Sequence, residues 1–183
     1  MKKKPPYLSL LKYSIPLLLC LAILAGCQAR KESNHIGPKY LRWVGDIEAD
    51  KKNDDPKFAL CGSEGDVRQY FNMSKGLQFE GEKEALDRLI RAQYKPVSKA
   101  DQNGWIRVRF IVNCKGESGR FRLLEADEHY KERAFSKKIS KQLLEITTNL
   151  EGWKPIEDDG KAVDYYQYLT FKIEAGTLTD ILP

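Results

Sequence analysis

The pattern of apolar and polar residues in the second half of the chain predicts two amphipathic helices. Between residues 82 and 94, apolar side chains recur at helical spacing and would form one buried face, and Pro96 would end this helix. A second helix is expected after Ser136, a residue type that suits the N-cap, with Gly152 as its stop. The two apolar faces are Ala85, Leu86, Leu89, Ile90 and Tyr94 in the first helix and Phe135, Ile139, Leu143, Ile146 and Leu150 in the second.

Three strands are expected between and after these helices. Residues 104–113 alternate in polarity, which predicts a half-buried strand, and the turn at Lys115–Gly119 leads back into a second strand. A third strand is expected at 163–173, with its even-numbered residues facing away from the core. The order helix, strand, strand, helix, strand predicts an α+β domain in which two main helices lie on one face of a three-stranded antiparallel sheet.

The first 26 residues are typical of an export signal. The apolar run Ile15–Ala25 has 11 residues and follows four lysines, whereas a membrane-spanning helix needs about 20 apolar residues. The run ends in Leu-Ala-Gly-Cys, which resembles the lipobox of bacterial lipoproteins. That resemblance implies cleavage before Cys27 and acylation of its thiol, and Gln28 after it resembles lipoproteins sent to the outer membrane.

The chain is therefore divided into four parts. We expect a signal peptide at 1–26, a polar tether from lipidated Cys27 at 27–58, an extension packed on the domain at 59–80, and the α+β domain at 81–183. Within the tether, Trp43 and Ile47 are apolar enough to dock on the domain. Removing the signal leaves 27 basic and 26 acidic residues, so the net charge gives no reason to expect a nucleic-acid partner.

Two of the four cysteines remain for a structural role once Cys20 is cleaved off and Cys27 is acylated. Cys61 and Cys114 form an even pair in a compartment where disulfides persist, which predicts a disulfide. The alternative is two buried thiols that act as small apolar residues.

The order of these elements resembles the C-terminal domain of the TonB family, over about Gly81 to Ile173. The matching pieces are Tyr94-Lys95-Pro96, Gly104–Val112, Lys115-Gly116, Trp153-Lys154-Pro155, Gly160-Lys161 and Tyr168–Phe171. The residue inserted in the Tyr-Pro element departs from the family pattern, and the cysteine pair and residues 37–76 are not part of it.

The resemblance implies a binding module that docks an envelope protein, such as an outer-membrane transporter. Docking would occur by addition of an extended segment to a sheet edge, for which the final strand, 164–173, is the candidate. The outward Tyr166, Tyr168 and Thr170 would then flank the guest; alternatively, the tyrosines only stiffen the sheet. A further hypothesis is that the chain takes part in energy transduction, as TonB does. That role needs a membrane-spanning helix, which a cleaved and acylated chain would lack.

The same open face carries four arginines on the two strands of the hairpin, Arg107, Arg109, Arg120 and Arg122. Like charges side by side repel each other, so they need compensation. Glu117, Glu125 and Asp164 would supply it, or else an anionic ligand such as a glycan, phosphate or carboxylate would bind there.

Catalytic and metal-binding patterns are missing from the sequence. Only His35 and His129 occur, no Cys/His set has metal-ligand spacing, and no nucleotide-binding or nucleophile motif is found. We therefore expect a lipoprotein facing the periplasm that binds a partner, is not an enzyme and needs no cofactor or metal.

Overall fold

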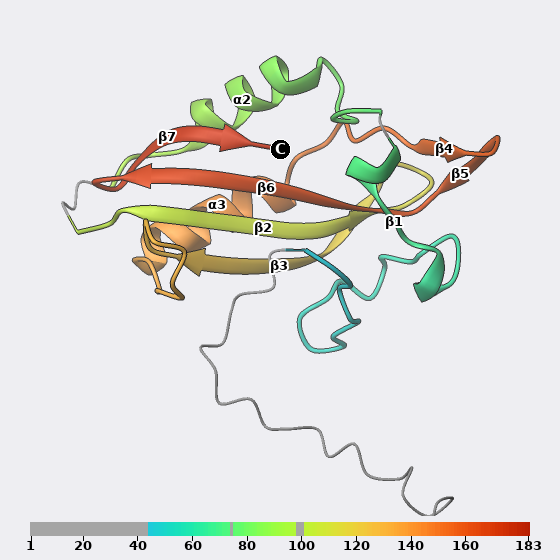
Figure 1. The fold of residues 1–183 in the computed structure, drawn as a ribbon, viewed down its shortest axis with the longest axis horizontal. Coiled ribbons are helices and arrows are strands. Elements are labelled where there is room, and N and C mark those ends of the chain that lie inside the picture. Colours follow the sequence, from blue (N-terminus) through green and yellow to red (C-terminus); the bar gives the residue numbers. More distant parts are fainter. Residues whose placement is uncertain (1–43, 74, 98–100) are drawn as a thin grey trace, which may run out of the picture. The chain divides into compact units, whose positions relative to one another are not determined.

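Both predicted helices form and lie on the same face of the sheet (Figure 1). The computed structural model describes residues 44–73, 75–97 and 101–183. Helix α2 spans Glu82–Gln93 and helix α3 spans Lys137–Thr148, with Ser136 as its N-cap residue. The apolar face of α2 is narrower than expected, because Leu89 is 43% exposed while Leu86 and Ile90 are fully buried.

The three predicted strands pair in the expected antiparallel manner. β2 spans Gly104–Val112, β3 spans Ser118–Ala126 and β6 spans Tyr165–Glu174. β2 lies between β3 and β6, so that Val108 faces Leu123 on one side and Leu169 on the other. The predicted hairpin 104–125 is therefore confirmed.

The sheet is larger than predicted and mixed. β1, Arg68–Gln69, runs parallel to the start of β6, and β7, Thr177–Leu182, pairs antiparallel with residues 170–174 at the same edge. The prediction of a three-stranded antiparallel sheet with residues 164–173 at its edge is wrong, because β6 has neighbours on both sides. β7 folds back through Ala175 and Gly176, which both have positive φ, as tight hairpin turns require.

The remaining elements are short. β4, Ile156–Asp158, and β5, Lys161–Val163, form a separate hairpin before β6. Two 3-10 turns, η2 at Glu64–Asp66 and η3 at Tyr70–Met73, flank β1.

The main core lies between the sheet and the two helices. Ile106, Val108, Phe110 and Val112 of β2 point into it, as the alternation predicted. Trp153 of the Trp-Lys-Pro element packs edge-on against the rings of Phe79 and Phe110 at 4.9 and 5.0 Å. The face of the sheet away from the helices is called the outer face below. It carries the odd residues of β2, the even residues of β6 and, because of a register shift in β3, Gly119 as well as Arg120, Arg122 and Leu124.

Candidate functional site

Residues 44–60, called the strap below, cross the outer face of the sheet. Ile47 is only 3% exposed and packs with Ile111, Tyr166 and Tyr168 in a second, smaller core. Phe58, Leu60, Val67 and Tyr70 pack around this cluster. The expected docking of Ile47 is therefore seen, and part of the segment expected to be a tether belongs to the folded domain. Cys27 and Trp43 lie outside the described residues.

Arg120 and Arg122 are paired with acidic residues that approach from outside the sheet. Arg122 donates to both carboxylate oxygens of Asp54, at 2.6 and 2.9 Å, and to the backbone carbonyl of Glu48 at 2.7 Å. Arg120 donates to both carboxylate oxygens of Glu64, at 2.6 and 2.7 Å. These bonds favour the charged carboxylates and hold the pKa of Asp54 and of Glu64 below their usual values.

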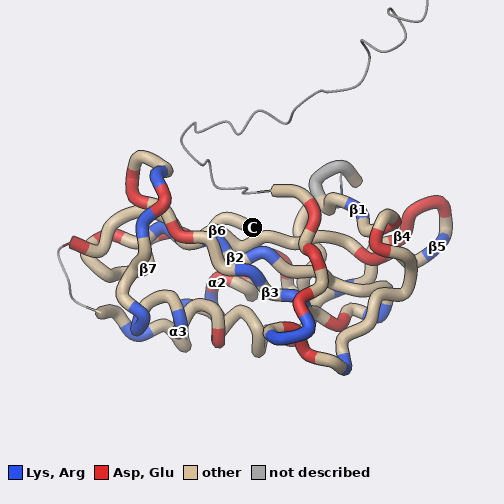
Figure 2. Tube along the Cα trace, turned by 90° about the horizontal axis from the view of Figure 1, so that it is seen from below, with Lys and Arg blue, Asp and Glu red and all other residues tan. Residues whose placement is uncertain are grey.

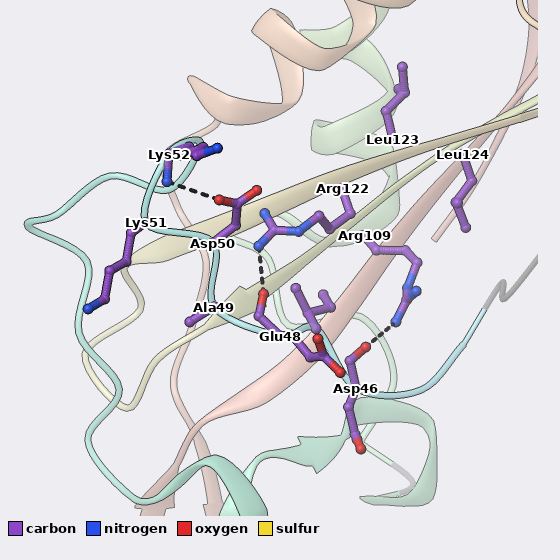
Figure 3. Close-up of a pocket in the computed structure, with 11 residues that line it drawn as sticks. Asp46, Glu48, Ala49, Asp50, Lys51, Lys52, Arg109, Arg122, Leu123 and Leu124 are labelled. Carbon is purple, nitrogen blue, oxygen red and sulfur yellow. Dashed lines mark hydrogen bonds between the residues drawn. The ribbon is translucent and has the colours of Figure 1, made fainter.

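Arg107 and Arg109 have partners of another kind. Arg107 donates to the hydroxyl of Thr170 at 2.8 Å, and Arg109 donates to the backbone carbonyls of Gly45 and Asp46. Figure 3 shows Arg109 reaching Asp46 and Arg122 reaching Glu48, on the two sides of a pocket of about 710 Å³ under the strap. Figure 2 shows the acidic positions of the strap beside the basic positions of β2 and β3.

The carboxylates named from the sequence as compensation for the arginines have other partners. Glu117 accepts from the Asn113 side chain, and Glu125 accepts from the Phe135 backbone N–H. Asp164 lies at the disulfide. Arg120 and Arg122 are thus compensated by acidic residues 56 and 68 positions away in the sequence.

Cys61 and Cys114 are bridged, with 6.0 Å between their Cα atoms. The carboxylate of Asp164, 3% exposed, accepts the backbone N–H groups of Cys61, Gly62 and Cys114 at 2.8 to 2.9 Å. Although the two sulfurs and the carboxylate lie together, the sulfurs are bonded to each other and the carboxylate oxygens already accept N–H groups. This cluster therefore fixes the strap to the ends of β2 and β6 and offers no metal ligands.

The side chains proposed to flank a guest at β6 are covered. Tyr166, Tyr168 and Thr170 are 2%, 3% and 6% exposed. The outer edge of β6 pairs with β1 at one end and with β7 at the other. Between them, the side-chain amide of Gln167 donates to the Tyr168 carbonyl at 3.0 Å. No described backbone segment of β6 is thus left open to an added strand.

The edge at β7 is also protected. Arg91 of α2 donates to the carbonyls of Leu178 and Thr179 at 3.0 and 3.3 Å, and the Asp180 carboxylate accepts the Ile181 N–H at 2.8 Å. Side chains that occupy edge groups in this way block further pairing.

β3 forms the opposite edge, and its backbone is more open. The N–H of Arg133 donates to the carbonyl of Glu125 at 3.2 Å, so the backbone at Glu125 points away from β2. Because this direction alternates along an antiparallel strand, the N–H and carbonyl groups of Leu123 also point outward. Beyond Arg122 a register shift interrupts the regular alternation, and there the Phe121 carbonyl accepts from the Arg122 side chain at 2.9 Å.

A groove of about 660 Å³ runs along this edge, called the β3 groove below. One wall is the strap turn with Asp50 and Asp55, and the other is the C-terminal part of α3 with Leu144 and Thr148. Phe121 and Leu123 of β3 form its floor. In Figure 3, Leu123 and Leu124 point to opposite sides of β3, Leu123 toward the helices. The groove therefore combines an open strand edge with an adjacent helix.

Nothing in the sequence identifies β3 as the open edge. The sequence predicts the hairpin that contains β3 and the amphipathic helix after it. The order of the strands in the sheet, however, depends on β7 and β1, which were not predicted.

In the described part of the chain no helix is long and apolar enough to cross a membrane. No protein-family model, curated protein or solved structure matches this chain.

Proposed function

We propose that this chain is a lipid-anchored interaction module of the bacterial envelope, which docks a protein partner by adding an extended segment of that partner to β3. The observation that carries the proposal is the outward-pointing backbone of Leu123 inside the β3 groove. In strand addition, main-chain hydrogen bonds supply affinity and pockets on either side select alternate side chains. A strand edge next to a helix offers both.

The anchor rests on the sequence. Leu24–Cys27 at the end of a short apolar run supports acylation of Cys27, and Gln28 supports an outer-membrane location facing the periplasm. An acyl group holds a chain to one leaflet. The proposal therefore covers docking alone and not the energy transduction performed by TonB-type proteins.

An anionic ligand on the four arginines receives less support. Asp54 and Glu64 already neutralise Arg122 and Arg120, and strap carbonyls accept from Arg109. A ligand would have to displace the strap and the Ile47 side chain buried beneath it. We also propose binding rather than catalysis, since the ionisable groups of the β3 groove are carboxylates and arginines engaged in structural hydrogen bonds.

The test uses a photo-crosslinking amino acid placed in the full chain in cells. At Thr148, on the α3 wall of the β3 groove, it is expected to capture one envelope protein. The matched control places it at Leu89, which is exposed on α2.

The discriminating variant is Leu123→Pro. Its N–H points outward, so proline leaves the β2–β3 hydrogen bonds intact but removes a donor that the guest strand needs. Leu123→Ala keeps the donor and controls for the lost side chain. We expect the Thr148 crosslink to persist in Leu123→Ala and to disappear in Leu123→Pro. An equal crosslink in a folded Leu123→Pro protein would overturn strand addition at β3.

A further inference from the structure

We propose that the guest segment alternates apolar residues with lysine or arginine. This inference rests on the proposed function and names the sequence class that the β3 groove selects. Side chains of an extended guest point alternately to the two sides of the sheet, so each wall of the groove meets every second residue.

The wall formed by α3 selects apolar side chains. Phe121, Leu123 and Leu144 are each half-buried against the main core, and all three line the groove. Guest residues on this side would cover the remaining apolar surface. Removal of that surface from water favours an apolar residue at each such position.

The wall formed by the strap turn selects positive charge. Five charged residues line the groove, but Arg122 is neutralised by Asp54 and Arg120 by Glu64. Asp50 and Asp55 form no ion pair with a lysine or arginine among the described residues, and Arg122, whose charge also acts on Asp50, has Asp54 as its ion-pair partner. Lys51 and Lys52 of the same turn line the pocket under the strap and not this groove.

Two further features add to the negative potential of the groove. Hydrogen bonds from the Lys52 N–H and the Asn53 side chain lower the pKa of Asp50, which keeps this carboxylate charged in mildly acidic surroundings. The C-terminal turn of α3, where Thr148 lies, has no basic residue, so the partial negative charge of the helix end is uncompensated. Both favour a cation in the guest.

The test compares three synthetic peptides that share valine at every second position and carry lysine, serine or glutamate between the valines. Binding to the full chain is measured by fluorescence anisotropy at low salt. The lysine peptide is expected to bind roughly tenfold more tightly than the glutamate peptide, with serine between them, because exposed ion pairs contribute modestly. The difference should shrink at high salt.

Asp55→Asn is the matched variant, since asparagine can still accept the Lys57 N–H that Asp55 accepts at 2.9 Å. It should reduce the preference for lysine about threefold. Asp159→Asn, in the exposed turn between β4 and β5, should leave the preference unchanged.

The outcomes separate this inference from the proposed function. Equal binding of all three peptides, abolished by Leu123→Pro, would overturn the preference for basic residues and leave docking at β3 intact. Failure of these peptides and of a randomised peptide library to bind, together with no crosslink at Thr148, would overturn both.

Discussion

Replacing both Cys61 and Cys114 with alanine is expected to lower the free energy of unfolding by about 4 kcal/mol. The disulfide joins residues 53 positions apart, in a loop that contains β1, α2 and β2. Without the bond, the unfolded chain regains the entropy that the closed loop had removed. The folded state should change little, because the Asp164 carboxylate still accepts backbone N–H groups from both sites.

Urea unfolding, followed by the fluorescence of the tryptophans, measures this change. With a denaturant slope of about 2 kcal/mol per molar, the unfolding midpoint should fall by about 2 M while the slope is nearly unchanged. Chemical reduction of the unaltered chain should produce the same midpoint as the double variant. A fall of less than about 0.5 M would refute the loop-entropy reasoning and would mean either that the unfolded chain stays restricted without the disulfide or that the folded state relaxes when the bond is lost.

Three further predictions concern the strap and the protected edge. Asp54→Asn should lower the free energy of unfolding by about 1 kcal/mol at pH 7. Because Arg122 lowers the folded pKa of Asp54 below 3.8, this stabilisation is complete above the unfolded pKa and is lost as pH falls through the folded pKa. A difference in unfolding midpoint between the unaltered chain and the variant that does not shrink as the pH falls below 3.8 would contradict the pairing. Gly119→Ala should cost about 1–3 kcal/mol in thermal unfolding, since its Cβ would lie 2.2 Å from the Phe58 ring, and an undiminished cost in a Phe58→Ala background would contradict that clash. Arg91→Met should increase self-association in light scattering by uncovering the β7 edge, and an unchanged monomer would show that Arg91 does not protect it.

The main core was predictable because its signals are local. Ile106, Val108 and Phe110 alternate along one strand, and the apolar residues of α3 recur at helical spacing. Each of these patterns is contained within a dozen residues. The helices, the hairpin and β6 follow from them without knowledge of any distant contact.

β7 was not predicted from the sequence, and the reason is physical. A register shift between Lys172 and Ile173 separates its two buried residues, Leu178 and Ile181, by three positions instead of two. The alternation that identifies a strand is therefore absent. β1 has only two residues and depends on its parallel pairing with β6, which no local pattern encodes.

The candidate site was the least predictable part. The arginines of β3 were recognised, but Asp54 and Glu64 could not be assigned to them, because the pairing depends on how the strap crosses the sheet. Ile47 was recognised as apolar enough to dock, but only its burial in the structure shows that the strap is part of the fold. Which strand has an open edge depends on the order of the whole sheet.

Amide hydrogen exchange at Leu123 tests the central claim most directly. The amide is measured by NMR in the full chain, free and bound to the tightest-binding peptide. We predict that exchange at Leu123 slows at least about tenfold on binding, whereas Arg122 and Leu124, which already pair with β2, change little. Unchanged exchange at Leu123 in a saturated complex would contradict strand addition at β3.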